Sequence, residues 1–205
     1  MAIAEQEQET SSKERILQLA IEALDAGGEA SIRVKQIADD AGVSVTSLYH
    51  FYGSREGLVE AALVHRFDDG YRAGRAATRE AAETATTKEE FAEVLERLIR
   101  HAFGPTYTAA RRRRINVAGA AISRPTLLAK INDAQREWFT ELHESLLVAQ
   151  RRGFTDPTVD MRAAATWHLI TANGLVCIEG DPTGADLEQW LDMYIDTMFR
   201  LIGLR

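Results

Sequence analysis

Residues Val34–Tyr52 read VKQIADDAGVSVTSLYHFY, and this stretch decides the fold of the N-terminal part of the chain. Two helices that cross at a steep angle need a small residue where they touch, and Ala38 supplies it. The turn between them needs a residue that tolerates positive φ, and Gly42 follows at a suitable distance. Together these two residues predict a helix-turn-helix.

The same stretch contains the small core and the helix cap that such a motif needs. Ser44 lies where the N-cap of the second helix belongs. Each requirement is weak on its own, but their agreement favours a helix-turn-helix over a chance helical hairpin. The apolar residues at the required offsets are Ile37, Ala41, Val43, Leu48 and Phe51.

The exposed face and the N-terminal end of the second helix are the candidate DNA-reading surface, because this end of a helix-turn-helix enters the major groove. Hydroxyl groups can bond several base edges, and a valine methyl can contact the methyl group of thymine. Tyr49 and His50 suit phosphate oxygens or base edges, although Tyr49 could instead pack under the helix. The candidates are Ser44, Val45, Thr46, Ser47, Tyr49 and His50.

Three basic residues flank this motif. Arg33 and Lys35 lie at the first helix, and Arg55 begins the next one. They could hold phosphates and fix the register on DNA, or any one of them could be a solvated surface charge. Acidic residues nevertheless outnumber basic ones over residues 12–59. We therefore expect weak non-specific affinity for DNA and a dependence on specific contacts.

The stretch over residues 12–58, which includes IADDAGVSVTSLYHFYGSREGL, resembles the N-terminal domain of the TetR family of transcriptional regulators. The chain has Phe51-Tyr52 where the family more often has Tyr then Phe, and Arg55 where Lys is commoner. It also has Val45-Thr46 in place of a common Lys-Gly pair, so no base preference is carried over. The resemblance implies a homodimer that binds a palindromic operator in double-stranded DNA and is released by a small-molecule inducer.

Helical signals recur along the whole chain, and no run shows the sustained two-residue alternation that is typical of strands. The sequence predicts an all-α fold of about nine helices. A helix-turn-helix domain is expected over residues 12–58 and a helical ligand-binding and dimerisation domain over residues 59–205, after a disordered acidic arm at residues 1–11. Ser54 is the expected N-cap of a long helix that runs to about Glu83.

The resemblance implies that the second domain binds an unknown small molecule and dimerises. A mixed pocket draws on aromatic and polar side chains, although most aromatic residues at helical spacing are core. The candidate pocket residues are Phe67, Tyr71, Phe91, Tyr107, Asn116, Trp138, Phe139, Trp167, His168 and Asn173. The last two helices carry broad apolar faces, which could form a four-helix dimer interface or could serve the core of the monomer. The candidate interface residues are Ala163, Ile170, Gly174, Cys177, Leu187, Trp190, Leu191, Tyr194 and Met198.

Other conspicuous residues have plainer interpretations. The run Arg111–Arg114 spreads around a helix, so we expect solvated charges paired with nearby acids rather than an anion site. The histidines show no metal-ligand spacing, and neither a metal nor another cofactor is expected. Cys177 lies in the apolar stretch GLVCIEG and is expected to be a buried, inert thiol.

The overall composition narrows the function class. A net charge of −7 over 205 residues argues against an indiscriminate DNA-coating protein. No apolar run reaches the roughly 18 residues of a membrane span, and the acidic start is unlike a secretory signal, so we expect a cytoplasmic protein. No nucleophile–base arrangement or phosphate loop is recognisable, so no enzyme is expected. A helical small-molecule-binding or enzymatic dimer that has lost DNA binding is the alternative class, followed by a protein-interaction module.

Overall fold

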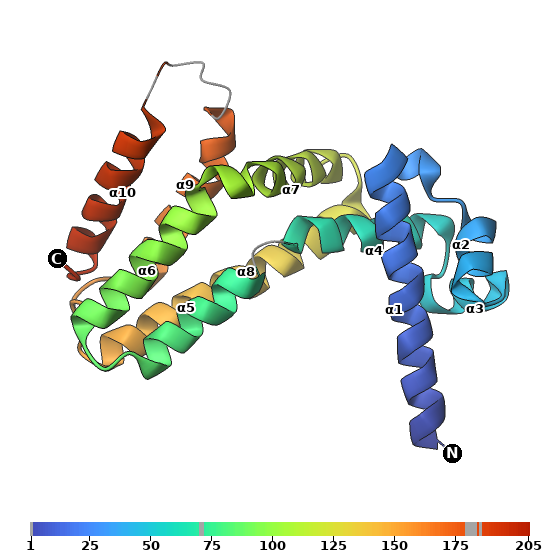
Figure 1. Cartoon of the computed structure of the whole chain (residues 1–205), viewed down its shortest axis with the longest axis horizontal. Coiled ribbons are helices and arrows are strands. Elements are labelled where there is room, and N and C mark those ends of the chain that lie inside the picture. Colours follow the sequence, from blue (N-terminus) through green and yellow to red (C-terminus); the bar gives the residue numbers. More distant parts are fainter. Residues whose placement is uncertain (1, 70–71, 179–183, 185) are drawn as a thin grey trace. The chain divides into compact units, whose positions relative to one another are not determined.

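The computed structural model describes residues 2–69, 72–178, 184 and 186–205. These residues form ten α-helices and three short 3₁₀ helices and contain no strand (Figure 1). The chain divides into two compact units, Met1–Phe67 and Asp68–Arg205, called unit 1 and unit 2 below. The prediction of an all-α fold is therefore confirmed, with one α-helix more than expected.

Unit 1 contains a three-helix motif and most of the helix that leads out of it. Its elements are α1 (Ala2–Gly27), the 3₁₀ helix η1 (Glu29–Ser31), α2 (Val34–Ala41), α3 (Val45–Tyr52) and α4 (Arg55–Asp68). The last residue of α4, Asp68, begins unit 2. Buried apolar side chains from all four helices form the core, among them Ile16, Leu24, Ile37, Leu48 and Leu58.

Local backbone chemistry fixes the turn between α2 and α3. Gly42 ends α2 with a φ of 70°, in the left-handed region that side-chain-bearing residues rarely adopt. Its N–H donates to the carbonyl of Asp39 at 3.1 Å, and the N–H of Val43 donates to the carbonyl of Ala38 at 3.0 Å. Ala38 is fully buried, as expected of a small residue at the contact between the two helices. The predicted helix-turn-helix geometry is confirmed.

Two side-chain contacts attach α3 and α4 to the first helix. The hydroxyl of Tyr52 donates to the carbonyl oxygen of Lys13 at 2.7 Å. Burial, together with the charge of Glu14, raises the pKa of Tyr52 to about 12, so the phenol keeps its proton for this bond. Arg66 on α4 forms an ion pair with Asp25 on α1 at 3.1 Å. These contacts thus attach the end of α3 and the C-terminal part of α4 to α1.

Unit 2 is a bundle around the long helix α8. Its α-helices are α5 (Arg72–Thr84), α6 (Lys88–Phe103), α7 (Thr108–Ala121), α8 (Pro125–Arg151), α9 (Met161–Gly174) and α10 (Leu187–Leu201). Two 3₁₀ helices, η2 (Pro105–Tyr107) and η3 (Leu175–Cys177), join them. Helix α5 packs against α6 and α8, and α6 packs against α10 (Figure 1). The core includes Phe91, Trp138, Leu146, Tyr194 and Phe199.

The boundary between the units lies after Phe67, not after residue 58 as predicted. The physical reason is that α4 does not end the first core at Leu58. Its next turns bury Val59, Ala62 and Leu63, and these residues continue the same apolar face.

Two predicted helix limits also differ from the structure. The helix expected from Ser54 to Glu83 is divided, because α4 ends at Asp68 and α5 begins at Arg72. Ser54 does cap α4, since its Oγ accepts the N–H of Gly57 at 3.0 Å. Helix α1 begins at Ala2, so residues 2–11 of the expected disordered arm are helical in the structure. Alanine, glutamate and glutamine predominate there, and they have high helix propensity.

We expect Gly42→Ala to lower the free energy of unfolding of unit 1 by about 1–2 kcal/mol, because a Cβ is strained at positive φ. The space around Gly42 is open, so the cost is confined to the backbone. Gly42→Asn is the matched control and should lose less, since asparagine tolerates the left-handed region. Urea denaturation followed by circular dichroism measures both, and an unchanged stability of Gly42→Ala would contradict the turn geometry.

Candidate DNA interface and ligand pocket

Helix α3 presents a polar face to solvent. Thr46, His50 and Tyr49 are exposed, and Val45 and Ser47 are half-buried. The exposed residues provide a hydroxyl, an imidazole and a phenol. All three groups can bond base edges or phosphate oxygens. The predicted reading residues therefore lie together on one short helix, and their contact with DNA stays a prediction.

Ser44 and Ser47 also stabilise the start of α3. The Oγ of Ser44 accepts the backbone N–H of Ser47 at 3.0 Å, and the two Oγ atoms lie 2.9 Å apart. The predicted N-cap role of Ser44 is confirmed. The two hydroxyl groups bond each other. A contact of either one with a DNA base would therefore replace this bond or be made in addition to it.

The three flanking basic residues have different surroundings. Arg33 and Lys35 are exposed at the start of α2. Arg55 instead joins the start of α4 to the turn ahead of α2: its Nε donates to the carbonyl of Ile32 at 3.0 Å, and its Nη2 donates to that of Glu29 at 2.5 Å. These two bonds use part of the guanidinium. Its remaining N–H groups are the ones that could make the predicted phosphate contact.

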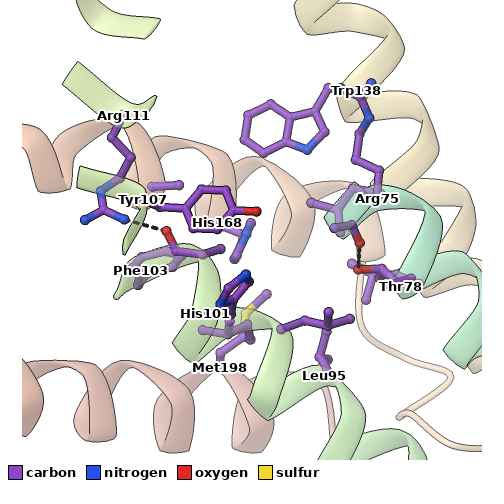
Figure 2. A pocket seen from close by; sticks show the side chains of 18 residues that line it. Arg75, Thr78, Leu95, His101, Phe103, Tyr107, Arg111, Trp138, His168 and Met198 are labelled. Atoms are coloured by element: carbon purple, nitrogen blue, oxygen red, sulfur yellow. Dashed lines mark hydrogen bonds between the residues drawn. The ribbon is translucent and has the colours of Figure 1, made fainter. Parts of the chain in front are cut away.

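Unit 2 contains a pocket of about 300 Å³ whose lining residues come from all six of its α-helices and from η2. Figure 2 shows Tyr107, His101, Trp138, Leu95 and Met198 gathered around this space. Aliphatic side chains of α6 and α8 form much of the wall. Sequence reasoning missed several of its polar and aromatic members, namely Arg75, Thr78, His101, Phe103 and Arg111.

Only part of the predicted pocket set lines this cavity. Tyr107, Trp138 and His168 do. Phe91 is fully buried and stacks on Phe154 at 5.9 Å between ring centroids, as expected of a core aromatic. The other described residues that do not line the pocket are Phe67, which belongs to unit 1, and Asn116, Phe139, Trp167 and Asn173. Tyr71 lies outside the described residues.

Arg75 bonds two carboxylates at the pocket wall. Its Nη1 and Nη2 donate to the two carboxylate oxygens of Asp68 at 2.6 and 3.2 Å, and its Nε lies 2.8 Å from Oε2 of Glu141 on α8. Burial opposes the charge of Arg75, but the hydrogen bond to Asp68 and the two carboxylates outweigh it and raise its pKa. The guanidinium therefore links the end of α4, α5 and α8.

Two arginines of the four-arginine run point inward. Arg111 and Arg114 are only 4% and 2% exposed, so the expectation of solvated charges is wrong for this pair. Their spacing of three residues puts both on one face of α7. Arg111 donates to the carbonyls of Ala102 and Gly104 at 2.5 and 3.2 Å, at the C-terminus of α6, where a cation is favoured. The guanidinium of Arg114 lies 4.7 Å from the ring centroid of Trp138.

A histidine–tyrosine pair lies in the same unit. Nδ1 of His168 is 2.6 Å from the hydroxyl oxygen of Tyr194. The phenol ring of Tyr194 stacks on two neighbouring rings, at 5.2 Å from Phe103 and 5.6 Å from Trp190. Burial lowers the pKa of His168 to about 4 and raises that of Tyr194. Both side chains are therefore uncharged at neutral pH.

The predicted dimer set falls into two groups. Leu191, Tyr194 and Met198 belong to the core of unit 2, each 4% exposed, so they do not present a surface to a second chain. They lie on the face of α10 that packs inside the bundle. For these three residues, the apolar pattern therefore serves the core of the monomer, which was the alternative to a dimer interface.

The remaining predicted interface residues can be reached from outside. Cys177 is exposed, so the expectation of a buried thiol is wrong: its apolar neighbours in sequence do not cover it in the fold. Ile170 is 65% exposed and Leu187 is 39% exposed. Trp190 is half-buried, and the other exposed members are Ala163 and Gly174.

These features define an all-helical protein in which a helix-turn-helix unit precedes a separate unit with an internal pocket. Residues 16–62 match the family described as bacterial regulatory proteins, tetR family. The resemblance predicted from the sequence is confirmed: residues 16–62 match the N-terminal model of the TetR family, and the chain has the fold of solved TetR-family regulators.

Solved structures match over nearly the whole chain. A chain from Mesorhizobium loti MAFF303099, described as a TetR-family transcriptional regulator, has 18% identity and a TM-score of 0.67, covering 94% of this chain and 96% of that chain. One from Rhodococcus sp., with the same description, has 21% identity and a TM-score of 0.62, covering 94% and 99%. The transcriptional regulator FadR from Bacillus subtilis, in complex with stearoyl-CoA, has 18% identity and a TM-score of 0.52, covering 90% and 96%. No curated protein matches the sequence significantly.

The described residues meet neither the requirements of a membrane-spanning helix nor those of a metal site. No helix in the described part of the chain is both long and apolar enough to span a bilayer. Over the same residues, no group of three or more His, Cys, Asp or Glu is placed to hold a metal ion.

We expect Arg75→Gln to lower the free energy of unfolding of unit 2 by about 2 kcal/mol, because it removes a charged donor from two carboxylates at a half-buried site. Arg79→Gln on the same helix is the control, since its pair with Glu83 is 3.8 Å long and both side chains are 56% exposed. Such a surface pair contributes about 0–1 kcal/mol. Urea denaturation compares the two, and equal stabilities would show that the Arg75 bonds do not hold the wall.

The His168 pKa predicts a pH dependence of stability. Unfolded histidine titrates near pH 6.5 and folded His168 near 4, so between these values the unfolded chain binds more protons and stability decreases as the pH is lowered. This contribution is complete above pH 6.5 and declines by up to about 3 kcal/mol towards pH 4. His168→Gln should remove this part of the slope. Denaturation curves at successive pH values measure it, and parallel profiles for the two proteins would refute it.

Proposed function

We propose that the protein is a cytoplasmic transcriptional repressor that binds a palindromic operator in double-stranded DNA as a homodimer and is released by a small-molecule ligand. One observation carries this proposal: a TetR-family DNA-binding domain and a helical unit with an internal pocket occur in the same chain. Helix α3 is the reading helix, with Thr46, Tyr49 and His50 exposed on it. Such a protein acts by occupying DNA rather than by catalysis.

Exposed apolar side chains on the last two helices support the homodimer. Ile170 on α9 is 65% exposed, and Met193 and Leu201 on α10 are 62% and 48% exposed. Covering such surface stabilises an interface by about 25 cal/mol per Å² of apolar area. A twofold dimer through this surface relates two helix-turn-helix units by one axis, as a palindromic site requires.

The pocket supports the ligand. Its volume of about 300 Å³ is within the range of small-molecule sites, and aliphatic and aromatic side chains make most of its wall. FadR from Bacillus subtilis, which has a similar fold, was solved in complex with stearoyl-CoA, so a protein of this architecture can bind a small molecule. Release from DNA requires that the ligand bind the free form more tightly than the DNA-bound form.

Helix α4 is the proposed route from the pocket to the reading helix. It begins at Arg55 in unit 1 and ends at Asp68, the first residue of unit 2. Asp68 bonds Arg75, which lines the pocket. A ligand that displaces Arg75 moves the end of α4. A change in the spacing of the two reading helices then weakens binding to successive major grooves.

Selection of duplexes from a random DNA library by the purified protein, followed by sequencing, tests the proposal. We expect enrichment of one palindromic sequence. Tyr49→Ala and His50→Ala should each lower the affinity for that sequence at least about tenfold, since a lost base or phosphate contact costs 1–3 kcal/mol. Gln18→Ala is the control, because Gln18 is exposed on α1 and bonds only Glu22 within its own helix.

Two results would contradict the proposal. A failure to enrich any sequence, even after the protein is unfolded and refolded free of bound molecules, would favour a helical ligand-binding dimer without DNA binding. Enrichment of a sequence without twofold symmetry would exclude the homodimeric reading mode.

A further inference from the structure

The charged side chains of the pocket already have protein partners. Arg75 bonds Asp68 and Glu141, so an anionic ligand that approached it would meet two carboxylates. The terminal nitrogens of Arg111 donate to the carbonyl of Gly104 at 3.1 and 3.2 Å, to that of Ala102 and to a threonine hydroxyl. A carboxylate or phosphate would have to displace these acceptors. The pocket is therefore poorly suited to an anion.

The same pocket is also poorly suited to a cation. No carboxylate is among the described residues that line it, so a cation would find no counter-charge there. An ammonium group could otherwise bind an aromatic face, but the guanidinium of Arg114 already lies over Trp138 at 4.7 Å, and the rings of Phe103 and Tyr107 pack against Tyr194 and His101. An uncharged molecule avoids both penalties.

His168 is an uncharged polar group that lines the pocket. Its Nδ1 lies 2.6 Å from the hydroxyl of Tyr194, whose ring is packed among Phe103, Trp167 and Trp190. The neutral phenol has one proton to donate, and Nδ1 is the one hydrogen-bond partner of this hydroxyl in the described part of the chain, so we assign Tyr194 as the donor and Nδ1 as the acceptor. A neutral imidazole that accepts at Nδ1 carries its hydrogen at Nε2. His168 thus has one N–H donor left for a ligand.

We propose that the pocket selects uncharged, mainly apolar molecules with one hydrogen-bond acceptor, a ketone, ester or lactone carbonyl, and that the Nε2–H of His168 donates to it. This inference rests on the proposed function and names the ligand class of that site. Leu95, Ile99, Leu142 and Leu146 hold the apolar body of the ligand. A molecule without the acceptor leaves the N–H of His168 unbonded, and a charged molecule must give up its hydration.

Isothermal titration of the full-length protein at pH 7.5 with four probes of similar size tests this selectivity. The probes are 4-phenylbutan-2-one, butylbenzene, 4-phenylbutanoate and 4-phenylbutylammonium. We expect the ketone to bind at least about tenfold more tightly than each of the others, since one hydrogen bond to a buried donor is worth about a factor of ten. His168→Phe should remove that advantage without changing the affinity for butylbenzene. His168→Gln retains an N–H donor and should keep most of it.

Three results would overturn the inference: tighter binding of phenylbutanoate, equal binding of ketone and butylbenzene, or no binding of the ketone. If phenylbutanoate is favoured and Arg75→Gln abolishes its binding, Arg75 is an anion site instead. Should His168→Phe fail to fold, the ranking of the four probes on the unaltered protein still decides. The titration contains no DNA, so its failure leaves the selection of an operator untouched, and failure of that selection leaves the ligand ranking standing.

Discussion

The guanidinium of Arg75 makes the bonds on which the arrangement of unit 2 most depends. From α5 it reaches Asp68, where α4 ends, and Glu141 on α8. Protein interiors are normally close-packed, and a bundle that leaves about 300 Å³ open forgoes contacts that would otherwise set the distances between its helices. Arg75 sets one of those distances, and Arg111 sets another by capping α6 from α7. Charged donors at the edge of the cavity and packed apolar side chains in its wall together hold its shape.

In unit 1, the turn and the second helix of the motif depend on contacts between residues that are close in the sequence. Its turn depends on the backbone of Gly42 and its second helix on the hydroxyl of Ser44, and both act within a few residues of themselves. Longer bonds add to these: Tyr52 bonds Lys13 on α1, Arg55 bonds the carbonyls of Ile32 and Glu29, and Arg66 pairs with Asp25. The exposed residues of α3 belong to unit 1, while a molecule that enters the cavity of unit 2 meets the ionic bonds of Arg75 and can alter them. This division suits a protein in which one unit recognises a fixed sequence and the other changes state.

The difference between local contacts in the helix-turn-helix and tertiary contacts around the pocket also explains how much could be predicted from the sequence. The helix-turn-helix could be predicted, because Ala38, Gly42 and Ser44 each meet a local requirement that the sequence displays. The pocket could be predicted only in part. Residue type does not say whether an aromatic ring such as Phe91 turns towards a cavity or towards packed neighbours. The burial of Arg111 was missed because its partners are backbone carbonyls, which leave no trace in a pattern of charges.

The placement of Trp138 has an optical consequence. Its indole lies in the pocket wall at 6% exposure, with the guanidinium of Arg114 over its ring. The emission of an indole depends on the charges and the water beside it. A molecule that fills the cavity changes these surroundings, so we expect it to shift the emission of Trp138 against a background from Trp167 and Trp190, which both contact the ring of Tyr194. The intrinsic fluorescence of Trp138 can therefore report whether the pocket is occupied, without an added label and without DNA.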